Sequence, residues 1–399
     1  MARHVAPVAR LLMPVDVAHP ARDRSIVLVA HLLLNALFLD PGGSGGPETY
    51  LRGLAPALRS ARPDTRITVA TTRSGAQALR ADGWGAWAGI RALPCEDGQR
   101  GRRQLSEQLL LPALARRIGA DLIHSLASVG PIRTPGTPHV ITLHDVTFFR
   151  ESTFSGVTTF GMRQVVSRAA RHADALIAVT QAARDEIVDE LDLDSSQFSV
   201  VHHGATLPDR PPALPESEIR ERLRLGDRRV VLCVATKRPH KNQELLVRAA
   251  TQLPDDVVVV LAGHPEPYDA ELRSLAGGLG VDGAVVFADY VPDAELEALW
   301  RMAGCAAFPT RAEGFGMPVL EALARGVPVA CSDLAVLREI GGDLPRFFDP
   351  DDPADAARKV TEALSLPHPL PGAGEWAARF TWDAAAAETW RVYERALAR

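Results

Sequence analysis

Residues 312–333 read AEGFGMPVLEALARGVPVACSD, which indicates a loop, a short helix and a strand in succession. Pro318 suits the first turn of a helix, where its missing N–H is not needed. Gly326 suits the position just past a helix end, where φ is often positive. The apolar run VPVACS that follows is typical of a buried strand. This unit carries Glu313 in the loop and Glu321 near the start of the helix.

The predicted loop and helix start suit a ligand that has both phosphates and hydroxyl groups. The first turn of a helix presents unpaired N–H groups and the positive end of the helix dipole, and Gly314 and Gly316 let a ligand approach the backbone. The carboxylates of Glu313 and Glu321 would repel phosphate but accept hydrogen bonds from hydroxyl groups. A nucleotide sugar carries both kinds of group. The alternative is that both acids are solvated residues flanking a helix start.

Strand-like and helix-like runs alternate along the rest of the chain. Most candidate strands are continuous apolar runs, as expected for parallel strands covered by helices on both faces. Clear examples are SIVLVA (25–30), RITVAT (66–71), HVITLHD (139–145), RVVLCVAT (229–236), VVVVLAG (257–263) and VPVACS (327–332). Such alternation predicts an α/β fold with doubly wound parallel sheets.

A proline-rich stretch without strand pattern, residues 206–224, is interpreted as a linker between two domains. It separates an N-terminal Rossmann-like domain (1–205) from a C-terminal one (225–372). Residues 373–399 predict a final helix that packs back toward the first domain. Ligands of such sheets bind beyond the carboxyl ends of the strands, so the expected active site is the cleft between the two domains.

A basic loop follows the strand RVVLCVAT, and Asn242 is interpreted as the N-cap of the next helix. Lys237, Arg238 and Lys241 then lie at the carboxyl end of a parallel strand. A cation there would offset the charge on a departing diphosphate. The alternative is an ordinary solvated basic loop.

Two loops of the first domain are further candidates. Glycines at 42, 43, 45 and 46 precede an amphipathic helix, which makes a loop open to phosphate or to an acceptor, or else a plain flexible turn. The run HVITLHD delivers His144 and Asp145 to the carboxyl end of a buried strand, where polar side chains can contact a substrate. A satisfied structural pair is the alternative there.

The overall composition argues against several classes of protein. The 399 residues carry a formal net charge of −5, which disfavours nucleic acid as the main partner. The four cysteines have no CxxC spacing and are expected to pack in cores in a reducing cytoplasm. No GxGxxG follows the first strand of either half, which disfavours an ordinary nicotinamide dehydrogenase. The longest apolar run, residues 26–39, contains polar residues and is shorter than the ~20 residues that span a bilayer.

Residues 98–119 predict an apolar helix flanked by five arginines. Such a helix can contact anionic lipid at the inner face of a membrane, as in enzymes that act on lipid-linked acceptors. Pro112 interrupts its amphipathic face, so the favoured interpretation is a surface helix packed on the first domain. Weak peripheral membrane contact is the alternative.

Taken in order, these segments resemble the retaining glycosyltransferases of family four, which have the GT-B fold. The run EGFGMPVLEALARGVPVACSD resembles that family's E-x7-E signature, and the resemblance extends along nearly the whole chain. Four more segments are similar to the family: YVPDAELEALWRMAGCAAFPTRAEGFG before the signature, VVHHGAT at the end of the first domain, the histidine-bearing LHDVTFF, and the glycine loop GGPETY.

The resemblance implies a role for each matching residue of the second domain. Glu313 is expected to hold hydroxyl groups of the donor sugar, and Glu321 to accept from the ribose hydroxyls. Lys241 is expected to neutralise the diphosphate. The donor is also expected to contact the backbone at Gly314, Phe315, Gly316 and Met317.

On the first-domain side, the resemblance implies that His144 faces the donor sugar and that Gly45 and Gly46 line the cleft. Family members also carry a glycine and then an arginine after the first strand of the second domain, where this chain has alanine and threonine. Lys237 or Arg238 is therefore expected to supply the second cation from a shifted backbone.

The implied reaction transfers a hexose from a nucleotide sugar, with GDP-mannose slightly favoured, to a hydroxyl of a glycan, lipid-linked or small-molecule acceptor. The first domain is expected to bind the acceptor and the second the donor. The configuration at the anomeric carbon is retained, and neither a metal nor a cofactor is required. A catalytically silent GT-B partner protein and a GT-B nucleotide-sugar epimerase are the alternatives.

Overall fold

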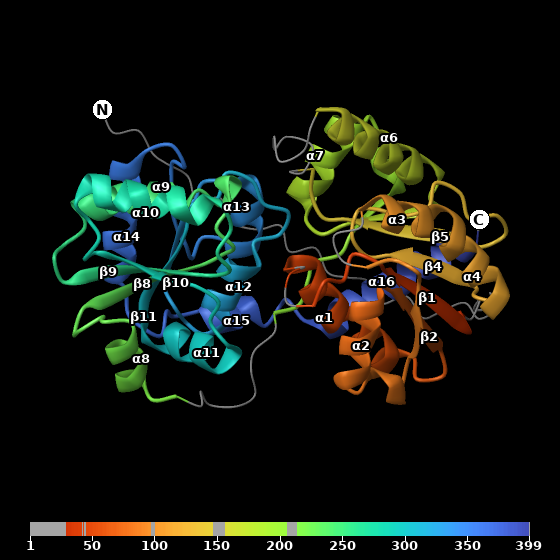
Figure 1. The fold of residues 1–399 in the computed structure, drawn as a ribbon, viewed down its shortest axis with the longest axis horizontal. Helices are drawn as coiled ribbons and strands as arrows, with labels where there is room; N and C mark the ends of the chain where they lie inside the picture. Colours follow the sequence, from red (N-terminus) through yellow and green to blue (C-terminus); the bar gives the residue numbers. More distant parts are fainter. Residues whose placement is uncertain are drawn as a thin grey trace, which may run out of the picture.

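The computed structural model describes residues 29–41, 43, 45–96, 100–146, 156–205 and 214–398. Two parallel sheets lie next to each other along the long axis of the molecule, each with helices on both faces (Figure 1). The first sheet has seven strands in the order β3-β2-β1-β4-β5-β6-β7, and the second has six in the order β10-β9-β8-β11-β12-β13. The predicted α/β fold with two doubly wound parallel sheets is confirmed.

The elements of the first half follow one another as alternating strands and helices. Its strands are β1 (His31–Ala36), β2 (Arg66–Thr71), β3 (Gly89–Ala92), β4 (Leu122–Ser125), β5 (His139–Leu143), β6 (Ala175–Ala178) and β7 (Phe198–Val200). Its helices are α1 (Gly46–Ala61), α2 (Arg73–Ala81), α3 (Arg100–Leu105), a π-helical turn (Ser106–Leu110), α4 (Leu111–Ile118), α6 (Gly156–His172) and α7 (Gln181–Leu191). All strand pairs in this sheet are parallel.

The second half repeats this pattern. Its strands are β8 (Arg229–Val234), β9 (Val257–Ala262), β10 (Val285–Ala288), β11 (Ala303–Phe308), β12 (Val329–Ser332) and β13 (Arg346–Phe348). Its helices are α8 (Glu216–Arg222), α9 (Gln243–Ala249), α10 (Tyr268–Leu279), α11 (Asp293–Met302), α12 (Met317–Ala324), α13 (Ala335–Gly341), α14 (Pro353–Leu364), α15 (Ala373–Ala377) and α16 (Trp382–Leu397).

The order of strands marks where each sheet can bind a ligand. In the first sheet the chain moves outward from β1 to β3 and then returns to add β4 on the other side of β1. In the second sheet it moves outward from β8 to β10 and returns to add β11 beside β8. The connections leave these neighbouring strands in opposite directions, which opens a crevice at their carboxyl ends. The β8–β11 crevice is therefore the expected donor side.

The first strand begins later than predicted. Residues 25–28 of the predicted strand SIVLVA lie outside the described residues, and β1 runs from His31 to Ala36. A histidine is accommodated in this fully buried strand because both ring nitrogens are paired. Nδ1 lies 3.0 Å from the carbonyl oxygen of Ile118, and Nε2 lies 2.8 Å from the hydroxyl of Thr68.

Two segments bear on the proposed domain boundary: the predicted linker and the final helix α16. Residues 206–213 of the predicted linker lie outside the described residues, whereas 216–222 form helix α8, whose Ile219 is buried in the core of the second half. Helix α16 packs on α1 of the first half (Figure 1). The Trp390 indole donates to the carbonyl oxygen of Leu58 at 3.3 Å.

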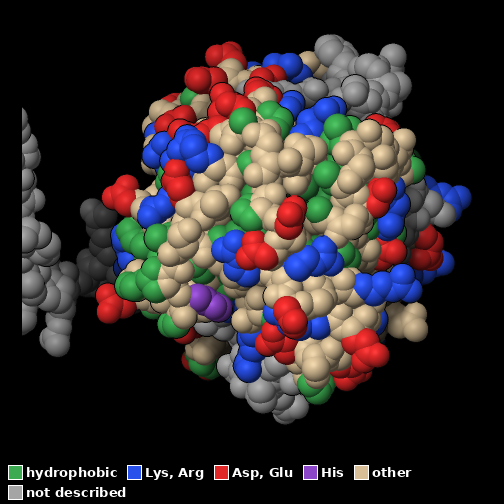
Figure 2. Space-filling view, turned by 90° about the vertical axis from the view of Figure 1, so that its left-hand side faces the viewer, with side chains coloured by type: hydrophobic (Ala, Val, Ile, Leu, Met, Phe, Trp, Pro, Cys, Tyr) green, Lys and Arg blue, Asp and Glu red, His purple; other side chains and the backbone are tan. Residues whose placement is uncertain are grey.

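The end of the molecule formed by the second half presents basic and acidic side chains intermixed (Figure 2). Arginine–carboxylate pairs such as Arg229–Asp256 and Arg248–Glu244, at 2.8 and 2.9 Å, are distributed over this half. Charges of both signs in alternation create little net field at a distance. This part of the surface therefore does not have the one-sided basic character that nucleic acids require.

The arginine-flanked segment of the first half forms α3, the π-helical turn and α4 in succession. Its first two residues, 98 and 99, lie outside the described residues. Pro112 directly follows the π-helical turn within this continuous helical run, and it has no N–H to donate to the preceding turn. Within the described ranges, no helix combines the length and apolar character needed to cross a bilayer.

Candidate active site

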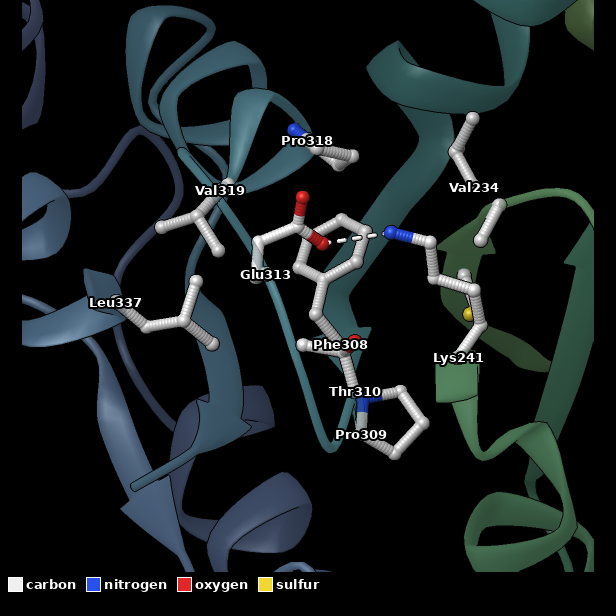
Figure 3. Close-up of a pocket in the computed structure, with 12 residues that line it drawn as sticks. Val234, Lys241, Phe308, Pro309, Thr310, Glu313, Pro318, Val319 and Leu337 are labelled. Atoms are coloured by element: carbon white, nitrogen blue, oxygen red, sulfur yellow. Dashed lines mark hydrogen bonds and ion pairs between the residues drawn. The ribbon is translucent and has the colours of Figure 1, made fainter. Parts of the chain in front are cut away.

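A pocket opens at the carboxyl ends of β8 and β11, in the crevice of the second sheet (Figure 3). Its walls come from the ends of these strands, the start of α12 and the side of α13. They are formed chiefly by Cys233, Val234, Phe308, Pro309, Thr310, Pro318, Val319 and Leu337. The pocket is only partly enclosed, and its volume of about 20 Å³ has room for about one water molecule.

Lys241 and Glu313 meet in this pocket. The Lys241 ammonium lies 2.6 Å from Glu313 Oε2, and about a quarter or less of each side chain is exposed (Figure 3). These two residues were predicted to hold the diphosphate and the donor sugar, and they are direct neighbours. Among the residues described, Lys241 is the single cation in the pocket wall. An ammonium has three donors, so pairing with Glu313 leaves capacity for a phosphate oxygen.

Asn242 fixes the loop that carries Lys241. Its side chain does not cap α9 as predicted, because its backbone is left-handed, with φ of 55°. The amide instead donates to the carbonyl oxygens of Pro309 and Pro350, at 3.0 and 2.9 Å. Thr310 adds a hydrogen bond from its hydroxyl to the carbonyl of His240 at 3.1 Å. The lysine loop is therefore tied to the end of β11, beside the glutamate loop.

Helix α12 points its N-terminus at the pocket. Gly316 precedes the first helical residue with φ of 89°, a left-handed conformation that favours glycine. In the described part of the chain no side chain caps this helix. The backbone N–H groups of Phe315 and Met317 thus lie where a phosphate or a sugar oxygen can accept hydrogen bonds from them.

Neither Lys237 nor Arg238 supplies a second cation to the pocket, which corrects the prediction made for them. The Lys237 side chain is fully buried on the other side of the loop, where it donates to the carbonyl of Gly263 at 2.8 Å and lies 3.5 Å from Asp269. Burial lowers the pKa of Lys237. Arg238 is exposed and pairs with Glu266 at 2.9 Å. Lys237 thus holds the ends of neighbouring strands together, because a buried ammonium needs carbonyl and carboxylate partners.

Glu321 lies on α12 but is not part of the pocket wall. Its partly buried carboxyl group faces Arg325 and Glu297. These two residues form an ion pair with each other at 2.8 Å. Burial raises the pKa of Glu321 to about 7, and the negative charge of Glu297 adds to this, while Arg325 opposes it. Near neutral pH this carboxyl group is therefore only partly ionised in the absence of ligand.

His144 lies against the glutamate loop from the first domain. Its Nε2 lies 2.7 Å from the carbonyl oxygen of Leu126, which assigns the proton to Nε2 and leaves Nδ1 as an acceptor. Burial lowers the pKa of His144, although Leu126 and Asp145 oppose this, so the ring is neutral. A Cβ atom on Gly314 would lie 2.3 Å from the backbone oxygen of His144. The glutamate loop and the histidine strand are thus in direct contact.

The glycine loop ends at the start of α1. Gly42 lies outside the described residues, Gly45 stands before α1 with φ of 58°, and Gly46 is its first residue. A Cβ atom on either Gly45 or Gly46 would meet no atom within 4 Å. One turn later, the ring of Tyr50 lies 5.0 Å from that of His144. The start of α1 is therefore on the same side of the molecule as His144.

Several contacts across the cleft were missed in the sequence. The Thr180 hydroxyl donates to the carbonyl oxygen of Gly314 at 3.0 Å. Glu339, from α13, accepts from the backbone N–H groups of Gln181 and Ala182 at 2.8 and 3.0 Å, and so caps helix α7 of the other domain (Figure 1). Burial raises the pKa of Glu339, but these bonds and one from a histidine outweigh it and lower the pKa overall. The local sequence of α7 does not reveal this cap, because the capping residue lies more than 150 positions away in the chain.

Comparison with known proteins places this chain in a family. Residues 44–207 match the model of "Glycosyltransferase Family 4", and residues 215–378 match "Glycosyl transferases group 1". The D-inositol 3-phosphate glycosyltransferase of Nocardioides sp. is 32% identical over 313 residues, 72% of this chain and 65% of that protein. The chain thus spans about two thirds of the length of that relative. The MMP alpha-(1->4)-mannosyltransferase of Mycolicibacterium hassiacum is 27% identical over 71% of this chain and 72% of that protein.

A solved structure gives the same fold. Anabaena Alr3699/HepE, crystallised with UDP and glucose, superposes with a TM-score of 0.71 over 91% of this chain and 99% of that chain, at 20% sequence identity. At this identity the likeness concerns the fold, which is the GT-B arrangement of two facing Rossmann-like domains. The two family models cover both halves, and the relatives align across them. The chain belongs to glycosyltransferase family 4.

Proposed function

We propose that the chain is a retaining, metal-independent hexosyltransferase that moves a hexose from a nucleoside-diphosphate sugar to a hydroxyl group. The observation that carries this proposal is the pair of Lys241 and Glu313, 2.6 Å apart, in front of the uncapped start of α12. A cation, a row of N–H donors and a carboxylate are the groups that phosphates and sugar hydroxyls require. Among the described residues, Lys241 is the single cation that the pocket wall offers to the two phosphates, so the N–H groups at the start of α12 must stabilise the rest of their charge.

Each group has one task in the proposed complex. The diphosphate lies between Lys241 and the N–H groups of Phe315 and Met317, while Glu313 accepts hydrogen bonds from hydroxyls of the sugar. Glu321 accepts from the ribose, further along α12. His144 and the glycines 45 and 46 approach the sugar from the first domain, where the acceptor also binds.

The proposed reaction needs no carboxylate base. A phosphate oxygen of the departing nucleoside diphosphate takes the proton of the acceptor hydroxyl on the same face of the sugar, so the configuration is retained. Lys241 and the dipole of α12 stabilise the charge that develops on the leaving group. Closure of the two domains around the donor would exclude water and limit hydrolysis.

The names of the relatives suggest which donors to try. One relative is a mannosyltransferase, others are D-inositol 3-phosphate glycosyltransferases, and HepE was crystallised with UDP and glucose. We therefore propose GDP-mannose and UDP-glucose as the first donors, with dTDP-hexoses next. The acceptor is a hydroxyl group of a glycan, of a lipid-linked sugar or of a small molecule.

The test is a thermal-shift panel of UDP, GDP and dTDP, followed by nucleotide release from the matching sugar donors. A shift with one nucleotide and its release from the corresponding donor would support the proposal. Binding without release, with or without candidate acceptors, would instead favour a silent partner protein. Conversion of the donor to its epimer would favour an epimerase.

We expect Glu321→Gln to weaken binding of the identified nucleoside diphosphate by about tenfold, the loss of one hydrogen bond to a charged acceptor. In the wild-type protein the affinity should rise from pH 6 to pH 8, because the carboxyl with a pKa of about 7 must ionise to accept from the ribose. The variant should lack this rise. Calorimetric titration checks both, with Glu362→Gln on exposed α14 as the matched control. An unchanged pH dependence in Glu321→Gln would contradict the assigned role.

We also propose that the surface of α3, the π-helical turn and α4 rests on an anionic membrane. Leu105 and Leu109 are 61% and 66% exposed, which is unusual for large apolar side chains, and Leu110 beside them is 39% exposed. Arg116 and Arg117 are exposed in the last turn of α4. Apolar side chains next to arginines are the combination that lies in the headgroup region of an anionic bilayer.

Vesicles of phosphatidylglycerol and phosphatidylcholine test this surface. We expect the wild-type protein to sediment with them, and the double variant Leu105→Ser, Leu109→Ser to bind at least tenfold more weakly, because each leucine contributes about 1.5–3 kcal/mol when buried. Leu279→Ser, at an exposed leucine of α10 in the other domain, is the matched control. Equal sedimentation of both variants and the wild type would contradict the proposal.

A further inference from the structure

His203 lies between two aromatic rings that come from different domains. The ring of Tyr50, on α1, is stacked on it with centroids 4.7 Å apart and planes 28° apart. The ring of Phe315, in the glutamate loop, is stacked on the other face at 4.5 Å and 24°. Trp382, at the start of α16, lies 5.7 Å away and nearly parallel. The histidine is therefore the middle layer of a stack that joins the first domain to the glutamate loop.

This stack bears directly on the position of Glu313. Phe315 is two residues from Glu313, and the residue between them, Gly314, touches the backbone of His144. Phe315 is 4% exposed, so its ring is packed on nearly all sides while it is stacked on His203. When the stack forms, the glutamate loop is thus pressed against the histidine strand.

The Tyr50 side of the stack is held rigidly by a chain of buried hydrogen bonds. The Tyr50 hydroxyl lies 3.1 Å from the hydroxyl of Thr142, which lies 2.8 Å from Nε2 of His124. Nδ1 of His124 lies 2.6 Å from the hydroxyl of Tyr393, on α16. Because every member of this chain has a partner, Tyr50 presents a fixed surface to His203.

Only an uncharged ring fits in this place. His203 is 3% exposed, and within the described part of the chain neither of its ring nitrogens has a hydrogen-bond partner. Attraction between a cation and the faces of aromatic rings is smaller than the cost of burying an imidazolium whose two N–H groups find no acceptor. Burial lowers the pKa of His203 well below its ordinary value, and the neighbouring His144 and His202 lower it further.

The side chains that face His203 also favour an uncharged ring at this position. From α1 and from the end of β5 the titratable neighbours are Tyr50 and His144, and neither brings a negative charge at neutral pH. The glutamate loop and α16 contribute apolar rings. His202 is adjacent in the chain, and its Nε2 lies 2.8 Å from the Glu339 carboxylate, so it makes a contact across the cleft instead of a layer of the stack.

We propose that His203 is a positioning residue for sugar transfer, whose uncharged ring seats Phe315 and so closes the glutamate loop on the first domain, and whose protonation opens it. The role in transfer rests on the proposed function, whereas the opening itself does not. In the open state the ring meets water and takes up a proton at its ordinary pKa of about 6.5. Closure expels that proton. The ratio of closed to open molecules should consequently fall about tenfold for each pH unit below that value.

The variant that tests this is His203→Phe. Since the ring nitrogens have no described partners, phenylalanine keeps the stack, loses no hydrogen bond and cannot be protonated. His203→Gln, smaller and also unable to titrate, is the second variant in case phenylalanine disturbs folding. His172→Phe, at an exposed histidine of α6, is the matched control. Small-angle X-ray scattering of the ligand-free full chain between pH 8 and pH 5.5 measures opening as an increase in the radius of gyration.

We expect the wild type and His172→Phe to expand as the pH falls below about 6.5, and His203→Phe to stay compact. If His203→Phe melts well below the wild type, the flat profile is expected from His203→Gln instead. Nucleotide release from UDP-glucose or GDP-mannose should show the same difference in its acid limb. Expansion of a folded, non-titrating variant in parallel with the wild type would overturn the proposal. Absence of nucleotide release together with the expected scattering would count against the proposed function alone.

Discussion

Replacing Gly314 by alanine is expected to slow sugar transfer on the order of 10- to 100-fold while leaving nucleoside diphosphate binding intact. A Cβ atom at this position would lie 2.3 Å from the backbone oxygen and 2.9 Å from the carbonyl carbon of His144. Backbone atoms cannot rotate away as a side chain does, so the glutamate loop would have to retreat from the first domain. Overpacking of this kind costs roughly 1–3 kcal/mol, and the expected rate loss is that energy converted to a factor.

The measurement is a comparison of kcat with the affinity for the identified nucleoside diphosphate. The nucleotide is proposed to bind to the second domain, where Gly314 touches nothing else that closely, so its affinity should change less than twofold. Gly278→Ala is the matched control, because it makes the same chemical change on exposed α10, where a Cβ atom meets nothing within 4 Å. An alanine at 314 that lowers affinity and leaves kcat unchanged would mean that the observed contact between loop and strand is not part of the reactive state.

Much of the second domain could be predicted from the sequence because its signals are local. Pro318 and Gly326 bracket α12 as expected, and the apolar run after them forms β12. That Lys241 and Glu313 face one pocket followed from placing two loops at the carboxyl ends of parallel strands, whereas their ion pair was not predicted. Such loops share one edge of the sheet whatever the details of their side chains. The topology of the sheet is therefore enough to predict that these two residues lie close together.

The features that were not predicted depend on the direction of side chains and on contacts between the domains. Lys237 and Lys241 are four residues apart in one basic loop, yet one ammonium is buried among carbonyl groups and the other faces the pocket. The composition of the loop does not reveal this difference. Likewise, nothing in the sequence near His203 or Glu339 indicates that each contacts the opposite domain. Contacts of this kind arise only when two separately folded units meet.

Replacing Lys241 by alanine is expected to reduce transfer by about 10²–10³-fold, the usual cost of removing one group that stabilises charge in a transition state. It is the single cation in the wall of the pocket among the described residues, so nothing nearby replaces it. The loss of binding should fall on the diphosphate: affinity for UDP or GDP should decrease far more than affinity for uridine or guanosine. Lys359→Ala, at an ion pair of α14, is the matched control. Equal losses for nucleotide and nucleoside would contradict a role at the phosphates.

The contact between Lys241 and Glu313 adds a sharper expectation for the double variant. Without the lysine, the Glu313 carboxylate faces the diphosphate with no countercharge and repels it. Adding Glu313→Gln to Lys241→Ala should therefore recover part of the affinity for UDP or GDP, although transfer stays low because neither the cation nor the carboxylate is present. Residues in contact deviate from additivity in this way, whereas independent ones do not. Additive losses of diphosphate affinity would mean that the carboxylate and the phosphates do not share this pocket.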